Sequence, residues 1–158
     1  MMTDKYLFSE KDVFFAQGLW QSFRLHGRFS SPKIEEVLGG GIEAVENAHS
    51  FWQNANRLLV TLGTAWVFEH RETGKVVANC HRVAASAFRR RRLSVEECVQ
   101  TLETRFEKIF LAKPDLKIVV SVSPVRHLKD GFADNSRSKA TLLLAAEALE
   151  KKFPKAVF

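Results

Sequence analysis

Three short stretches carry groups that could act on a bound molecule. In TLGTAW an apolar run ends on Gly63, so backbone N–H groups there can be turned toward a ligand. Asn79 and His81 form a second pair: the amide donates two hydrogen bonds without a change of charge, and the imidazole can donate or carry a proton. Arg126 and His127 form a third pair, suited to an anionic or polar substrate group. These residue types predict a hydrogen-bonding site for a polar molecule.

Each stretch also has a purely structural alternative. Gly63 can serve only to permit a tight turn, and Asn79 can hold its own loop through side-chain hydrogen bonds to the backbone. The charged neighbours Lys129 and Asp130 can form solvated ion pairs that contribute little. At the level of sequence these alternatives remain open.

Other kinds of chemistry have weaker support. Cys80 and His81 are adjacent, so on an extended segment they point to opposite faces and cannot act as a nucleophile pair. Ser123 is followed by proline and lacks the Gly-x-Ser-x-Gly surroundings of a nucleophile elbow, so we expect it to cap a turn. No cluster of His, Cys, Asp or Glu has metal-ligand spacing, and the triplet at Gly39 lacks the Lys-Ser/Thr of a phosphate loop. We therefore predict neither a metal nor a cofactor.

The elements that position these stretches follow from apolar periodicity. A helix begins at Ser31-Pro32, a cap residue followed by proline, and Gly39–Gly41 should divide it into two pieces. A capping box at Ser94–Glu97 opens another helix, and Ser138 opens a third after a long polar loop. The expected strands are Arg57–Gly63 and Lys117–Val122, both buried, a hairpin of Trp66–Glu69 with Val76–Ala78, and the beginning of one more at Ala156–Phe158.

This alternation of helices and strands predicts an α/β fold, a three-layer α/β/α sandwich with a mainly parallel sheet. The chain of 158 residues, 46% of them hydrophobic, fits a single domain with a real core. Ligands of such sheets bind beyond the carboxyl ends of the strands. We therefore expect the three stretches at Gly63, Asn79 and Arg126 to converge on one rim.

Charge and cysteine content narrow the class of protein. The net charge of +6 is concentrated in Arg89–Arg92, which is interpreted as a solvated turn or helix edge, and no nucleic-acid-binding motif accompanies it. The two cysteines make no disulfide framework, which suits a reducing compartment. There is no apolar run of ~20 residues and no signal pattern. We expect a cytoplasmic protein that binds neither nucleic acid nor membrane.

Two long segments also resemble a known family. LLVTLGTAWVFEHRETGKVVANCHRVAASAFRRRRLSVEE and VSVSPVRHLKDGFADNSRSKATLLLAAEAL are similar to the central part of the GSCFA family, and TLGTAW, NCH and SPVRH make the similarity specific. That family is related by sequence pattern to the SGNH (GDSL-like) hydrolases. The resemblance implies a flavodoxin-like α/β/α sandwich and a site that processes a small ester or an acylated glycan.

The resemblance also implies roles for particular residues. Gly63 matches the glycine of the superfamily's Gly-x-Asn-Asp block, where a backbone N–H and an Asn side chain stabilise a developing oxyanion. The Asn position holds Ala65, so Asn79 becomes the candidate for the missing donor. His81, Arg126 and His127 are then expected to bind substrate.

The superfamily's nucleophile and base have no counterpart in the 158 residues. The serine is expected in a Gly-Ser-Cys-Phe-Ala stretch near the N-terminus and the base in an Asp-x-x-His pair near the C-terminus, and neither motif occurs. The resemblance therefore implies that residues 1–158 are one partial domain, inactive alone, and either marginally stable or self-associating through strands left uncovered. The alternative is a non-catalytic module that recognises a glycan or another polar ligand at the same rim.

Overall fold

The computed structural model describes residues 7–126 and 130–157. They form two compact units that alternate along the chain. Unit 1 comprises Met1–Asn54 and Val67–Arg91, and unit 2 comprises Ala55–Trp66 and Arg92–Phe158.

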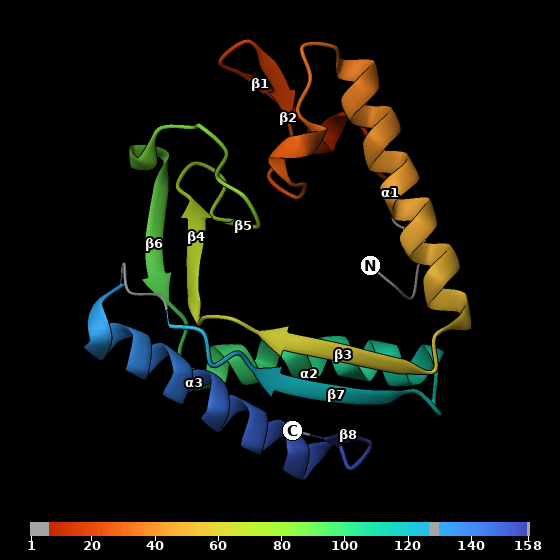
Figure 1. The fold of residues 1–158 in the computed structure, drawn as a ribbon, viewed down its shortest axis with the longest axis vertical. Helices are drawn as coiled ribbons and strands as arrows, with labels where there is room; N and C mark the ends of the chain where they lie inside the picture. The colour runs from red at the N-terminus through yellow and green to blue at the C-terminus, as the bar shows by residue number, and fades with distance from the viewer. Residues whose placement is uncertain (1–6, 127–129, 158) are drawn as a thin grey trace. The chain divides into compact units, whose positions relative to one another are not determined.

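Unit 2 is built on a parallel sheet in the order β3-β7-β8 (Figure 1). Strand β3 (Arg57–Leu62) pairs with β7 (Lys117–Val122) in register from Arg57 opposite Lys117 to Leu62 opposite Val122. The short strand β8 (Ala156–Val157) adds to the other side of β7, also in parallel. The parallel pairing expected for these two strands is confirmed.

Helices α2 (Val95–Ala112) and α3 (Gly131–Lys152) pack on each other and supply the core of unit 2. The capping box that opens α2 is present, because Ser94 Oγ accepts from the Glu97 N–H and the Glu97 carboxylate accepts from the Ser94 N–H. The buried side chains of this core include Cys98, Phe106, Ile109, Ile118, Val120, Leu142 and Leu149.

The two parallel strands are buried on one face only, so the prediction that both are buried strands is wrong. Ile118 and Val120 face the core, whereas Leu59, with 72% of its surface exposed, and Val119 lie on the open face. The prediction failed because the middle outward positions, Leu59 and Val119, are apolar, although the outward positions on either side of them are polar. The mixed α/β class is confirmed, but three layers are not observed.

Unit 1 contains two antiparallel sheets. Strands β1 (Phe14–Ala16) and β2 (Leu19–Gln21) form a hairpin around Gln17-Gly18. Strands β4 (Trp66–His70), β5 (Val76–Val77) and β6 (Phe88–Arg92) follow the order β5-β4-β6. The predicted hairpin of β4 with β5 is confirmed. The run Arg89–Arg92, expected as a turn or helix edge, instead forms most of β6.

Helix α1 (Ile34–Asn54) is continuous, so the expected break at the glycine triplet is wrong. The glycines admit two aromatic rings. A Cβ added at Gly41 would lie 2.5 Å from ring atoms of Phe8, and one added at Gly40 would lie 3.1 Å from the Phe29 ring. Packing of these rings therefore compensates for the poor helical propensity of glycine.

Helix α3 begins at Gly131, so Ser138 lies inside it rather than at its start. Of the polar residues that indicated a loop, Asp134 and Arg137 form an ion pair at 3.1 Å on the exposed side of the helix, whereas Asn135 is buried. None of the helices in the described part of the chain combines the length and apolar composition that a membrane crossing requires.

Candidate functional site

The loop after β3 and the loop after β7 leave the same edge of the parallel sheet. Gly63 follows β3 directly, and the Ser123 N–H, just after β7, donates to the Leu62 carbonyl at 2.9 Å. Ser123 Oγ accepts from the Val125 N–H at 3.3 Å, which is the predicted turn-capping role. Arg126 is exposed in this loop, and His127 lies outside the described residues.

Helix α3 fixes the loop that contains Gly63. Ser138 Oγ accepts from the Ala65 N–H at 2.8 Å and lies 3.0 Å from Thr64 Oγ1. Lys139 Nζ donates to the Gly63 carbonyl at 2.6 Å. Ala65 is only 1% exposed and belongs to the cluster of Cys98, Leu142 and Ala145. A buried hydroxyl and a lysine thus hold three successive residues of the loop in place.

Two backbone N–H groups of this loop make no hydrogen bond to the part of the chain that the structure describes. Among the described residues, no acceptor lies within hydrogen-bond reach of the Gly63 or Thr64 N–H. The backbone conformation at Gly63 does not require a glycine, because its φ is not in the left-handed region. A Cβ added there would meet nothing within 4 Å. The tight-turn explanation for this glycine therefore has no structural support, and no described residue fills the space next to it.

The sequence does not predict Ser138 and Lys139 as residues that hold the Gly63 loop, because Ser138 is expected there as the first residue of its helix. The signal was nevertheless present. Ser138, Leu142, Ala145 and Leu149 recur at the spacing of one helical face, which places the serine on the buried side.

Asn79 and His81 follow β5, which belongs to the antiparallel sheet. They were expected on the rim of the parallel sheet because their strand was expected to run parallel to β3 and β7. Since β5 belongs to another sheet, that argument does not apply to them. Asn79 Oδ1 accepts from the His81 N–H at 2.8 Å, and Asn79 Nδ2 lies 3.4 Å from the Leu25 carbonyl. His81 Nε2 lies 2.6 Å from the Ser22 carbonyl. Asn79 Oδ1 therefore holds its own loop, and the two side chains together connect this loop to the segment Ser22–Leu25.

The same two residues also line a cavity of about 410 Å³ that lies within unit 1. Its other walls come from the β1–β2 hairpin and the short helix η2 (Gly27–Phe29). The polar side chains around it are Gln17, Gln21, His26, Ser30, Asn79, His81 and Arg82.

Neither cysteine is an activated nucleophile. Burial raises the pKa of the Cys80 thiol. Burial, with a smaller contribution from the negative charge of Glu97, raises the pKa of Cys98. Both groups therefore remain protonated near neutral pH, and the thiolate is the reactive form. Within residues 7–126 and 130–157, no three His, Cys, Asp or Glu side chains gather closely enough to hold a metal ion.

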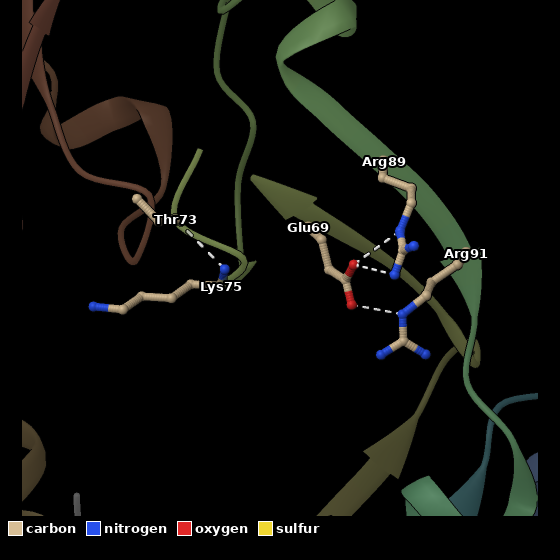
Figure 2. A network of polar contacts seen from close by, with 5 residues as sticks. All are labelled: Glu69, Thr73, Lys75, Arg89 and Arg91. Carbon is tan, nitrogen blue, oxygen red and sulfur yellow. Dashed lines mark hydrogen bonds and ion pairs between the residues drawn. The ribbon is translucent and has the colours of Figure 1, made fainter. Parts of the chain in front are cut away.

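The arginine run on β6 is anchored by one carboxylate (Figure 2). Glu69 Oε2 accepts from Arg89 Nε and Nη2 at 3.0 and 2.7 Å, and Oε1 accepts from Arg91 Nε at 2.6 Å. The Arg91 hydrogen bond, followed by that from Arg89, lowers the pKa of Glu69. Arg90 lies 5.8 Å from the ring centroid of Phe68. Alternate arginines thus stabilise the sheet.

A mixed α/β fold with a fixed loop beyond a parallel strand pair is the class of structure that these observations define. The model of the GSCFA family matches residues 1–158, and the chain belongs to this family. No curated protein and no solved structure matches it significantly.

Proposed function

We propose that the loop at Gly63 and Thr64 forms the oxyanion-binding part of a GSCFA-type, SGNH-like ester hydrolase or acyl-transfer domain. The observation that carries the proposal is the pair of N–H groups at Gly63 and Thr64, which find no acceptor among the described residues, on a loop that Ser138 and Lys139 hold in place. Preorganised donors of this kind are worth about 2.7–4 kcal/mol of transition-state stabilisation each.

In this mechanism a serine attacks the ester carbonyl, and its proton passes to a histidine. The carbonyl oxygen becomes an oxyanion, which the backbone donors at Gly63 and Thr64 bind in the open space above the glycine. Arg126 and His127 orient the polar part of a small ester or acylated glycan. The oxyanion role of Asn79 and the substrate contact of His81 remain predictions.

The 158-residue chain alone should not turn over esters. It contains neither a Gly-Ser-Cys stretch nor an Asp-x-x-His pair, and without nucleophile and base only residual stabilisation of the transition state remains. The proposal includes the three-layer sandwich for the catalytic domain. It also includes a cytoplasmic location, which the two free thiols favour.

The first test is to search the DNA on both sides of this segment for the Gly-Ser-Cys stretch and the Asp-x-x-His pair. The second is to express the full reading frame and to assay the protein on p-nitrophenyl acyl esters. We expect turnover that a Ser→Ala change in the Gly-Ser-Cys stretch abolishes. Gly63→Ala, which fills the open space, should lower kcat/KM by about tenfold or more. Gly39→Ala is the matched control, because its added Cβ also meets nothing and Gly39 lies in α1.

A complete reading frame without both motifs would rule out the enzyme. Equal kcat/KM for Gly63→Ala and wild type would rule out the oxyanion role of this loop. If the motifs are absent, the alternative function is non-catalytic, namely recognition of a glycan or another polar ligand by the same edge of the sheet.

A further inference from the structure

The cavity of unit 1 presents two hydrogen-bond acceptors. His81 Nε2 lies 2.6 Å from the Ser22 carbonyl, which can only accept, so the proton of the neutral ring is on Nε2 and Nδ1 is an acceptor. Gln21, which is 5% exposed, donates from Nε2 to the Ala16 carbonyl at 3.0 Å. Its Oε1 accepts no hydrogen bond from the described residues. Both acceptors suit the hydroxyl groups of a ligand.

The cavity also presents donors and positive charge. Arg82 is exposed, and its guanidinium forms no hydrogen bond or ion pair with the described residues. His26 Nδ1 accepts from the Arg28 N–H at 3.1 Å, so Nε2 of the neutral ring is a donor. None of the described lining residues is acidic. A guanidinium with free N–H groups is matched to a carboxylate.

The walls of the cavity are held in an unusual backbone conformation. Gln17 and His81 are the two non-glycine residues of the described chain with positive φ, 53° in each case, and both line the cavity. Gln17 Nε2 bridges the walls by donating to the Arg82 carbonyl at 2.7 Å, and the Asn79 side chain holds the His81 N–H. Left-handed residues fixed by such bonds concentrate at binding sites, where they preorganise the walls.

We propose that this cavity binds a small polyhydroxylated carboxylate, a sugar acid in chemical class. Arg82 binds the carboxylate, and Gln21 Oε1 and His81 Nδ1 accept from hydroxyl groups. The volume of about 410 Å³ accommodates one sugar-sized molecule. The site lies entirely in unit 1 and does not depend on the ester chemistry proposed for the β3 loop.

The test is calorimetric titration of the 158-residue protein with D-glucuronate, D-glucose and acetate at matched ionic strength. We expect saturable binding of glucuronate, and at least about tenfold weaker binding of glucose, which lacks the carboxylate, and of acetate, which lacks the hydroxyls. Arg82→Gln should weaken glucuronate binding by about tenfold and leave glucose binding unchanged. Arg82→Lys, which keeps the charge but loses the fork, should be intermediate.

Arg71→Gln is the matched control, because Arg71 is an exposed arginine of unit 1 outside the cavity lining. Thermal unfolding of each variant verifies that it is folded. The proposal is overturned if glucuronate does not saturate by about 10 mM, if glucose binds equally well, or if Arg82→Gln and Arg71→Gln behave alike. This measurement uses neither an ester substrate nor the proposed serine nucleophile, so a negative result here would not count against the proposed hydrolase.

Discussion

Ser138 is the residue on which the Gly63 loop most depends. Its hydroxyl is the acceptor for the N–H of buried Ala65, so Ser138→Ala leaves that donor without a partner. We expect a loss of about 1–3 kcal/mol in the free energy of unfolding, measured by urea denaturation. Ser136→Ala is the control, since Ser136 is exposed on the same helix. Equal losses for the two variants would show that the loop is held by other contacts.

Glu69 makes the stability of β4 and β6 dependent on pH. Its pKa is lower in the folded protein than in the unfolded chain, because Arg91 and Arg89 favour the charged carboxylate. Its stabilising contribution is therefore present above the unfolded pKa, about 4.3, and is lost as the pH falls through the folded pKa. Glu69→Gln should be less stable than wild type at pH 7, and the difference should vanish in strong acid.

Thermal unfolding between pH 7 and pH 2 measures this difference. Glu72→Gln serves as the control, because Glu72 is exposed in the adjoining turn and forms no ion pair with the described residues. If Glu69→Gln lost the same stability at every pH, the arginine pairing would not be its origin.

Helix α1 offers a matched pair of glycines. Gly39→Ala adds a Cβ that meets nothing, so it should stabilise the protein by up to about 1 kcal/mol through helical propensity. Gly41→Ala places a Cβ 2.5 Å from the ring of Phe8, which is 6% exposed, and should destabilise by about 1–3 kcal/mol. Chemical denaturation of the two variants gives both values. Stabilisation by both would mean that Phe8 does not pack against α1.

Local signals in the sequence predicted individual elements well and their surroundings poorly. The capping box at Ser94 and the strand at Lys117 depend on neighbouring residues and were predicted correctly. The continuity of α1 depends on Phe8 and Phe29, which are distant in sequence, so the glycine triplet appeared to be a break. The same distinction applies to the positions of the candidate site residues. Gly63 follows its strand as expected, but the strand before Asn79 belongs to an antiparallel sheet, which depends on tertiary pairing.

At the scale of the molecule, the free edge of β3 is the expected route to self-association. Lys117 N–H donates to Asn56 O and Ser123 N–H to Leu62 O, so the odd-numbered residues of β3 direct their backbone groups away from β7. Leu59 is one of them, and it is largely exposed. Exposed apolar edges recruit further strands. We expect the apparent mass in static light scattering to rise with concentration.

Leu59→Lys should abolish that rise, because a charge on an edge strand opposes pairing. Leu111→Lys is the control, since Leu111 is 86% exposed but lies on α2. A wild-type protein that stays monomeric at high concentration, or two variants that behave alike, would contradict association through β3.

The parallel pairing of β3 with β7 also imposes an order of events on synthesis. Thr61 and Ser121, which face each other on the two strands, are 60 residues apart in the chain. A ribosome adding about 5–20 residues per second needs about 3–12 s to supply the second strand after the first. During that interval the apolar β3 segment has no parallel partner, while strands β4, β5 and β6 are synthesised. The nascent chain therefore displays a short hydrophobic strand for seconds, long enough for a chaperone to bind it before β7 does.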